Sequence, residues 1–463
     1  MPAPESAVPA SGPLPAPRLN RLFVIALLLA NFGSNVALIA PIQNLLPRMI
    51  EQAAGSSGKA LGLGIVTGIG ALAALVFNLV AGHFSDRWRR TDNRAYTVLF
   101  GLVAGTLGHV ILAYQHSVLG IAIWWTICQA AINVAYSPMS AVIVDHVDRK
   151  FWGLVWGLVS VAQAVGLIIG LAAVVLVFPS TTAGMLSVAV GYGLFLIPLV
   201  VVLHRLPRVS SPSKDSGSAD AGDAPPRRGL IAGSLPAFHA LLGERGFRSV
   251  MAGRFLIMLA ETIALLYMYY YLQDDIRYPN PGHGQLILIL IATIATIMAT
   301  VTVGRAADLS GGYRRYSVLA SVLMAATALA LAGLTEWTLV MACAFALGAG
   351  YGAFMSVSQA LSLTVLPDPS TAGRDLGILN IAYTIPQVIG APVAGVVVAD
   401  LGGYRGLFIF AALLATVAAF SFSRVPSDPD APPAISTGLQ PPAERMHAPA
   451  EGADTRSQWC QGA

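Results

Sequence analysis

Long runs of apolar residues, separated by short polar turns, recur along almost the whole chain. Each run is roughly 20 residues long, which an α-helix needs to cross a hydrocarbon core of about 30 Å at 1.5 Å per residue. A helix is favoured because a backbone in lipid must satisfy its own hydrogen bonds. The pattern predicts an all-α integral membrane protein with twelve transmembrane helices, near residues 21–46, 60–82, 95–114, 119–144, 152–177, 184–204, 249–272, 284–305, 316–334, 337–360, 374–399 and 405–424.

These spans fall into two groups of six, separated by a polar stretch rich in Ser, Pro, Gly and charged residues. Residues 1–20 lack the small-residue cleavage pattern of a secretory signal peptide, so we expect a retained tail. The expected organisation is an N-terminal tail, a first half, a linker, a second half and a C-terminal tail, at residues 1–20, 21–204, 205–248, 249–424 and 425–463.

Composition agrees with a membrane protein. Of 463 residues, 56% are hydrophobic and 11% are charged, whereas soluble domains carry about 25% charged residues. The net charge of +4 is spread over short loops, which argues against a nucleic-acid surface. Cys128 and Cys343 lie in apolar runs and Cys460 in a polar stretch, with neither a disulfide framework nor a metal-binding spacing.

The loops carry an asymmetric distribution of the 27 Lys and Arg residues. With the N-terminus on the inside, only Arg48, Lys59, Arg277 and Arg405 fall in outer loops, and Arg254 falls within a span. Because cytoplasmic loops are enriched in Lys and Arg, this predicts a multi-pass protein of the cell membrane with both termini in the cytoplasm.

The loop after the second span, residues 82–90 (GHFSDRWRR), places a glycine and an acid among arginines. A weaker copy, residues 304–308 (GRAAD), follows the eighth span. A glycine permits close helix approach, and an aspartate can accept hydrogen bonds from a helix N-terminus. A second match relates the fifth and eleventh spans at one constant offset, pairing Gly153, Gln163 and Gly166 with Gly377, Gln387 and Gly390. The chain is therefore predicted to contain two related halves.

The loop resembles the signature loop of the major facilitator superfamily, and six helices repeated once is that family's plan. The resemblance implies two halves around a central site near the bilayer midplane, working as a monomer. It also implies a gating latch at the inner ends of the halves, in which the arginines pair with acids such as Asp145 or Asp148. Simple cytoplasmic anchoring by the arginines is the alternative. The gating residues so expected are Gly82, Asp86, Arg87, Arg90, Asp145, Gly304 and Asp308.

Three short stretches are similar to the sucrose-transporter-like and glycoside-pentoside-hexuronide symporter branches of this family. They lie at residues 85–94, 137–145 and 373–387. The tenth span departs from such relatives, because residues 356–359 (SVSQ) contain no acid.

Glu261 is the expected proton-coupling residue, because it lies near the middle of the seventh span, where an ionised carboxylate is costly. Arg254 is seven residues earlier, about 10 Å along the helix axis. The alternatives are that Glu261 stays protonated and bonds a neighbouring helix, and that Arg254 extends to the inner headgroups.

Amide and tyrosine side chains recur within the spans, and several share a helix face. In lipid such groups must turn inward, either to line a cavity or to join helices. Because amides both donate and accept hydrogen bonds and aromatic rings stack on sugars, the set suits a neutral polar solute. The substrate-cavity candidates are Asn31, Asn35, Gln129, Asn133, Tyr136, Gln163, Gln359, Asn380, Tyr383 and Gln387.

Other aromatic residues cluster near the outer ends of spans. Tyr267, the run 269–271 (YYY), Trp124 and Trp125 are expected to form an interfacial belt. His109 in the third span could relay protons, although a lone intramembrane histidine is more often simply hydrogen-bonded.

The sequence thus predicts a secondary transporter, coupled to protons, that moves a sugar or similar small neutral solute through the bilayer. Efflux of a hydrophobic drug or secondary metabolite is the alternative, although the fourth span lacks the arginine that drug exporters of this family usually carry; a non-transporting sensor ranks below it. No nucleotide-binding G-x-x-x-x-G-K-[ST] loop or covalent-catalysis constellation is present. We therefore expect neither an enzyme nor a cofactor.

Overall fold

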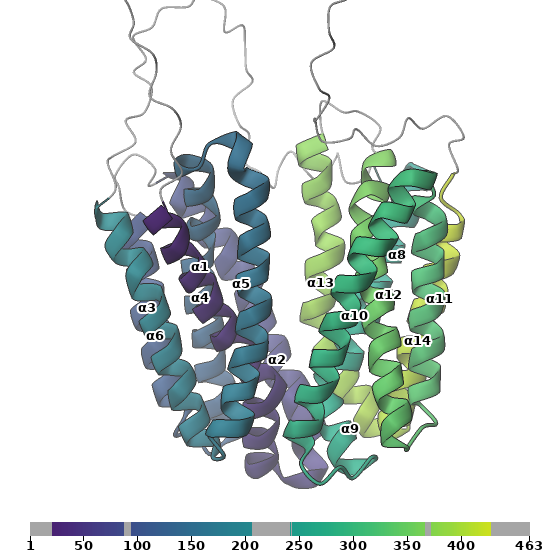
Figure 1. The fold of residues 1–463 in the computed structure, drawn as a ribbon. Coiled ribbons are helices and arrows are strands. Elements are labelled where there is room, and N and C mark those ends of the chain that lie inside the picture. Colours follow the sequence, from purple (N-terminus) through teal and green to yellow (C-terminus); the bar gives the residue numbers. More distant parts are fainter. Residues whose placement is uncertain (1–20, 88–93, 206–240, 242, 366–371, 427–463) are drawn as a thin grey trace, which may run out of the picture.

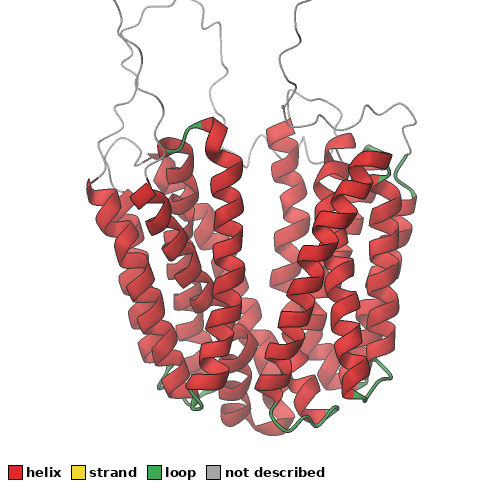
Figure 2. Cartoon of the chain, in the orientation of Figure 1, coloured by secondary structure: helices red, strands yellow, loops and turns green. Residues whose placement is uncertain are grey.

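The computed structural model describes residues 21–87, 94–205, 241, 243–365 and 372–426. Figure 2 shows that these residues form helices joined by short loops. Apolar runs become helices here because each backbone N–H then finds its acceptor within the same segment. The prediction of an all-α membrane fold is confirmed.

The first half contains six long helices (Figure 1). They are α1 (Arg21–Ala40), α2 (Leu46–Arg87), α3 (Arg94–Leu112), α4 (Val118–His146), α5 (Trp152–Ala172) and α6 (Thr181–Arg205). Two π-helical segments, η1 (Pro41–Leu45) and η4 (Ala173–Val177), and a 3-10 turn, η3 (Arg149–Phe151), complete it. Within this half, α1 packs on α5 and α6, and α4 packs on α2 and α3.

The second half repeats the arrangement. Its helices are α8 (Arg245–Leu266), α9 (Met268–Asp274), α10 (Pro281–Ser310), α11 (Tyr313–Leu331), α12 (Trp337–Thr364), α13 (Ala372–Asp400) and α14 (Gly403–Ser423). Here α12 packs on α10 and α11, and α14 packs on α8 and α11. The short α9 follows α8 after the single non-helical residue Tyr267, so the half again has six long helices.

The described chain contains 11 segments apolar and long enough to cross a membrane, one fewer than the twelve expected. The difference comes from Arg21–Asn78, a single segment of 58 residues that runs through α1, η1 and most of α2. At 1.5 Å per residue this is about 87 Å, far more than one crossing needs. The chain breaks at Gly55, whose φ of 72° lies in the left-handed region that glycine adopts without a Cβ penalty. The segment therefore accounts for two crossings.

Close backbone contacts hold α10 and α12 together. A Cβ on Gly348 would lie 2.7 Å from Ala292 Cα, and one on Gly352 would lie 2.8 Å from Thr296 Cα. Thr296 and Thr300 donate hydrogen bonds to the carbonyl oxygens of Gly348 and Gly352, at 3.0 and 3.2 Å. Small residues that admit such approach are a main source of helix association in membranes.

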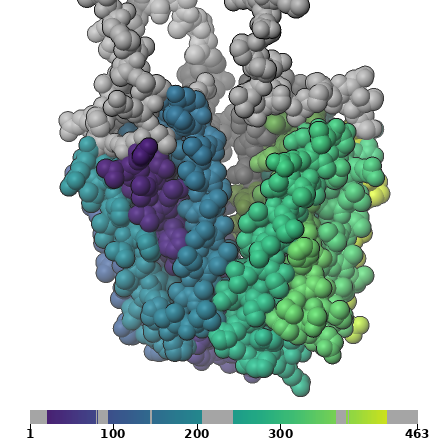
Figure 3. Space-filling view, in the orientation of Figure 1, coloured from purple at the N-terminus to yellow at the C-terminus, as the bar shows by residue number. Residues whose placement is uncertain are grey.

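The two halves meet mainly through α2 on α13, with smaller contacts of α5 and η4 on α10. The space-filling view shows them in close contact over its lower part and separated above (Figure 3). We call the lower end, which contains η1 and α9 (Figure 1), the closed end, and the opposite end the open end.

Candidate functional site

A polar network lies near the middle of the first half and joins three of its helices. Gln163 Nε2 on α5 donates to Asn31 Oδ1 on α1 at 3.1 Å and to Tyr136 Oη on α4 at 3.1 Å. Asn35 Nδ2, one turn after Asn31, donates to the same Tyr136 oxygen at 2.9 Å. Four of the candidates chosen from sequence are thus brought together. We call Asn31, Asn35, Tyr136 and Gln163 the amide–tyrosine network.

Gln129 and Asn133 lie on the same face of α4, nearer the closed end than Tyr136. Asn133 Nδ2 donates to the Gln129 carbonyl oxygen at 2.9 Å, and its Oδ1 accepts from Asn78 Nδ2 at 3.3 Å. Gln129 is buried, and its Oε1 has no hydrogen-bond partner. The neighbouring Trp125 Nε1 is likewise buried and unpaired. This face of α4 therefore has unused hydrogen-bonding capacity.

The second half carries a cluster around Glu261, which is half-buried in the middle of α8. Tyr383 on α13 is hydrogen-bonded to Gln387 and to Tyr351 of α12, and the charge of Glu261 acts on both tyrosines. Gln387 is exposed although it lies within a span. Asn380, the remaining candidate on α13, has its side chain outside the described residues.

Arg254 lies two turns before Glu261 and is only 5% exposed. Its Nη1 donates to Gln359 Oε1 and to Ser362 Oγ on α12, both at 3.0 Å. The expectation that Arg254 extends to the headgroups is therefore wrong, because its guanidinium is held inside the bundle by α12. Gln359 is exposed beside it.

Among the described side chains, no hydrogen bond joins the amide–tyrosine network to the Glu261 cluster. Hydrogen bonds between the halves occur at the closed end, where Lys59 Nζ of α2 contacts Glu51 Oε1 at 2.9 Å and Asp274 Oδ1 of α9 at 2.8 Å. Gln273 Nε2 donates to Glu51 at 2.8 Å, and Tyr404 Oη donates to Asp274 Oδ2 at 2.6 Å. We call Glu51, Lys59, Gln273, Asp274 and Tyr404 the closed-end latch.

The tyrosines expected to form an interfacial belt are buried, so that prediction is wrong for Tyr267, Tyr270 and Tyr271, and Trp125 is buried too. Tyr267 Oη donates across the halves to the Ala60 carbonyl at 2.7 Å, and Tyr270 Oη donates to the Pro47 carbonyl at 2.7 Å. Their hydroxyls seal the closed end. Sequence reasoning missed both the buried tyrosines and the closed-end latch. The signal available for the latch was the coincidence of a lysine and several acids in outer loops that carry little other charge.

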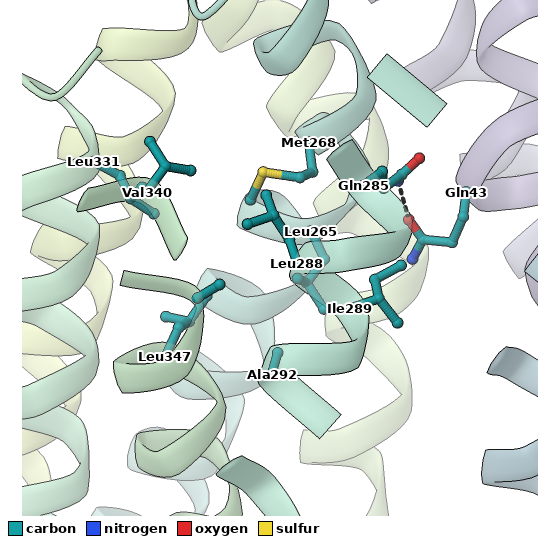
Figure 4. Close-up of a pocket in the computed structure, with 11 residues that line it drawn as sticks. Gln43, Leu265, Met268, Gln285, Leu288, Ile289, Ala292, Leu331, Val340 and Leu347 are labelled. Atoms are coloured by element: carbon teal, nitrogen blue, oxygen red, sulfur yellow. Dashed lines mark hydrogen bonds between the residues drawn. The ribbon is translucent and has the colours of Figure 1, made fainter. Parts of the chain in front are cut away.

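A small apolar cavity lies at the closed end of the second half (Figure 4). It is lined mostly by Leu, Ile, Met and Val side chains of α8, α9, α10 and α12. Gln43 reaches it from η1 and accepts a hydrogen bond from Gln285 Nε2 at 2.7 Å, which again links the halves. The cavity offers few polar partners and is distinct from the amide–tyrosine network.

His109 is buried in α3, with both ring nitrogens beside carbonyl oxygens. Nδ1 lies 2.7 Å from the Gly105 oxygen, and Nε2 lies 3.2 Å from the Ala37 oxygen on α1. This anchors α3 to α1 and favours the structural alternative for His109.

The expected gating loop falls largely outside the described residues. Arg90 is not described, and the side chains of Gly82, Asp86, Arg87 and Asp145 are not described either. Its copy is visible at the end of α10, where Asp308 Oδ1 accepts a hydrogen bond from Tyr313 Oη at 2.9 Å. Gly304 faces Ser356 of α12, and an added Cβ would make an ordinary contact at 3.6 Å. In the described part of the chain, no three His, Cys, Asp or Glu residues are grouped to hold a metal ion.

The sequence matches the profile of the Major Facilitator Superfamily over residues 22–308 and 250–450. The chain belongs to this superfamily. The match covers both halves, and it confirms the resemblance inferred from the 82–90 loop.

Relatives of known name are distant. The chain is 22% identical to monocarboxylate transporter 10 of Rattus norvegicus, over 68% of this chain and 61% of that protein. It is 29% identical to the purine ribonucleoside efflux pump NepI of Escherichia coli, over 32% of this chain and 37% of that protein. The chain thus spans less than two thirds of either curated relative.

Solved structures show the same superfamily fold at low identity. The nucleoside transporter NupG superimposes with a TM-score of 0.68 at 14% identity, covering 88% of this chain and 99% of that one. A bacterial homologue of the human lysosomal transporter Spinster, described as inward-facing and unoccupied, gives 0.63 at 13% identity, covering 89% and 100%. These likenesses show that the chain shares the multi-pass membrane fold of its superfamily.

Proposed function

We propose that this protein moves a small polar solute, such as a sugar or a similar neutral compound, across the cell membrane by alternating access. The observation that carries the proposal is the amide–tyrosine network. Uncharged polar side chains from α1, α4 and α5 converge in the middle of the bundle. At this depth it would be costly for them to face the lipid. Amides and a tyrosine hydroxyl can exchange their mutual hydrogen bonds for bonds to a hydroxylated solute.

The arrangement of the halves supports alternating access. Hydrogen bonds and an ion pair join them at one end, and the space-filling view shows them apart at the other (Figure 3). The Lys and Arg distribution supports a cytoplasmic assignment for the open end and for both termini. On this assignment the structure is inward-facing, the state named for the Spinster homologue of similar fold. Gly304 and Asp308, at the end of α10, would gate the opposite state on this assignment.

Glu261 is the proposed proton-coupling residue. It lies within a span, and the described residues provide no cation paired with it. An acid in this setting can take up a proton when its surroundings are dry and release it when the cavity admits water. Tyr383 is hydrogen-bonded to Gln387 and lies within the electrostatic influence of Glu261, so a proton on Glu261 could affect how the second half meets the solute.

The curated relatives carry names of small organic solutes, a monocarboxylate and a purine ribonucleoside, and they leave the direction of transport open. Efflux of a more apolar compound is the second candidate. It is favoured by the apolar cavity beside Gln43 and Gln285. We expect the protein to act as a monomer. Its partners would then be the lipid bilayer and the solute.

Counterflow in proteoliposomes tests the proposal. Vesicles loaded with one unlabelled compound from a panel of sugars, nucleosides, carboxylates and amphiphiles are diluted into the labelled compound, and accumulation is measured with and without an imposed pH gradient. The wild type should exchange at least one polar compound and concentrate it when the gradient is present. Glu261→Gln should retain exchange and lose the dependence on the gradient.

Glu336→Gln is the matched control, because Glu336 is exposed in the loop before α12 and the substitution removes the same charge. It should behave as the wild type. If the wild type exchanges amphiphiles only, the proposal of a polar solute is wrong and efflux of an apolar compound takes its place. Gradient-driven accumulation that survives in Glu261→Gln would remove Glu261 from coupling.

A further inference from the structure

Arg254 is a buried cation that uses only part of its hydrogen-bonding capacity. Both of its recorded hydrogen bonds leave from Nη1, to Gln359 and Ser362. Its Nε is buried and has no partner. The edge of the guanidinium formed by Nε and Nη2 therefore takes no part in those two bonds. This edge presents two parallel N–H groups, the arrangement that binds a carboxylate through both oxygens.

The surroundings of Arg254 supply neutral partners. In the part of the chain that the structure describes, the ion pairs all involve Lys59, at the closed end. Glu261 is seven residues further along α8, about 10 Å along the axis, and it makes no ion pair with Arg254. A buried charge without a counter-charge is costly, because hydration is lost and only neutral dipoles replace it. Within a membrane span such a residue usually belongs to a substrate or ion pathway.

The neighbours of Arg254 indicate that it lies close to a water-accessible part of the bundle. Gln359, its partner on α12, and Gln387, the hydrogen-bond partner of Tyr383, are both exposed within predicted spans. An exposed amide at membrane depth is unfavourable against lipid, so both side chains face water rather than acyl chains. Arg254 also acts electrostatically on Tyr383, which belongs to the Glu261 cluster.

We propose that Arg254 binds a carboxylate group of the transported solute through its Nε–Nη2 edge. The inference rests on the transport function proposed above and specifies the solute further, as a small organic acid whose remaining polar groups are bound by the amide–tyrosine network. Gln359 and Ser362 act as positioning residues, because their bonds to Nη1 fix the plane of the guanidinium. On this account the polar solute carries a carboxylate in addition to its neutral polar groups.

The melting temperature of the unliganded protein distinguishes a substrate-binding arginine from a structural one. Removing a structural arginine breaks its bonds to α12 and lowers the melting temperature. Removing a buried charge that has no counter-charge among the described residues relieves a desolvation cost. We therefore expect unliganded Arg254→Met and Arg254→Gln to melt at or above the temperature of the wild type in detergent.

The binding test compares matched pairs of compounds by thermal shift. The pairs are glucuronate and glucose, lactate and lactamide, and nicotinate and nicotinamide, all at constant ionic strength, with inorganic phosphate as a second kind of anion. A ligand that binds only the folded protein raises its apparent stability by RT ln(1 + [L]/Kd). At least one carboxylate should stabilise the wild type more than its neutral partner does. Its affinity should fall at least tenfold in Arg254→Gln and to an intermediate value in Arg254→Lys, which keeps the charge and loses the two-pronged geometry.

Two results would overturn the inference. One is that no carboxylate stabilises the wild type more than its neutral partner or phosphate does. The other is that the preference persists unchanged in Arg254→Gln. Counterflow with the same pairs distinguishes these results from failure of the proposed function. Exchange of neutral members by both proteins would leave the transporter proposal standing without the anion site, whereas absence of exchange for all members in the wild type would count against both.

Discussion

Lys59 Nζ on α2 lies 2.8 Å from Asp274 Oδ1 on α9, so a single ion pair spans the two halves at the closed end. The lysine is nearly buried, with 6% of its side chain exposed, and Glu51 binds the same nitrogen. Tyr404 of α14 holds the other oxygen of Asp274. The latch therefore links α2, α9 and α14, and its rupture must accompany any opening of this end.

Asp274→Asn should weaken the latch and favour the state in which this end is open. The substitution removes the charge that Lys59 and Tyr404 bind, and a hydrogen bond to a charged group contributes about 1.5–3 kcal/mol. Since 1.4 kcal/mol is a factor of ten, the ratio of the two states should change by roughly tenfold or more. Spin labels at Gln52 and Arg405, one on each half and both exposed, would report a longer distance by double electron–electron resonance.

Asp275→Asn is the control for this experiment. Asp275 is adjacent and exposed, and it takes no part in the ion pairs of the described residues. Partial burial and the nearby charge of Asp274 raise the pKa of Asp275, so its ionisation costs slightly more in the folded protein than in water. Its removal should leave the label distance unchanged and stability equal or marginally higher. Equal distances in Asp274→Asn and the wild type would show that the latch does not set the conformation.

Gly64→Ala should also open the closed end, for a steric reason. A Cβ on Gly64 would lie 2.7 Å from the Ala391 carbonyl oxygen and 3.2 Å from Pro392 Cα, both backbone atoms of α13. Overpacking of this kind typically costs about 1–3 kcal/mol. The same pair of labels should therefore move apart. Gly157→Ala on α5, where nothing lies within 4 Å of the added Cβ, should leave the distance unchanged and raise the melting temperature, since alanine stabilises a helix.

Gly348→Ala should destabilise the second half without changing which end is open. The added methyl would meet the backbone of Ala292 on α10, which cannot move without separating two packed helices. Gly350 lies two residues after Gly348 on the same helix. The added Cβ of Gly350→Ala would lie 2.7 Å from Met324 Cγ, and a flexible methionine side chain can move away. Thermal unfolding in detergent should give a clearly lower melting temperature for Gly348→Ala than for Gly350→Ala. Similar values would mean that the α10–α12 contact adapts more easily than its geometry indicates.

The fold was largely predictable because hydropathy alone defines membrane spans. The apolar runs predicted the bounds of the long helices within a few residues, except that α2 begins at Leu46, well before the predicted span at 60–82. The repeat of Gly82 and Asp86 at Gly304 and Asp308 indicated the family. Hydropathy could not show where the helical segment at residues 21–78 divides into two crossings, because the break depends on the backbone angle of Gly55 rather than on a polar loop.

The site was predictable in composition and only partly in arrangement. Period-3.6 spacing placed Asn31 and Asn35 on one face, yet their meeting with Tyr136 and Gln163 depends on how α1, α4 and α5 pack. The lysine and acids of the outer loops were a signal for the latch, but their pairing was not predictable, because Lys59 and Asp274 are distant in sequence and each alone is an ordinary loop charge. The tyrosines of α9 were misassigned because amphipathic rings suit both a headgroup region and a sealed interface.

Tyr136→Phe should lower the affinity for the solute while leaving stability nearly unchanged. The hydroxyl accepts hydrogen bonds from Asn35 and Gln163, and without it both amides lose their fixed positions beside the space between the halves. Water can satisfy the freed amides, whereas a solute that depends on their orientation should bind about tenfold more weakly.

Tyr192→Phe is the control, because that hydroxyl is fully buried and donates to the Gly101 carbonyl at 3.2 Å. It should cost about 1 kcal/mol of stability and leave affinity intact. Melting temperature and solute affinity measured on both variants would separate the roles, and a Tyr136→Phe protein that melts early but binds normally would reduce the network to a helix contact.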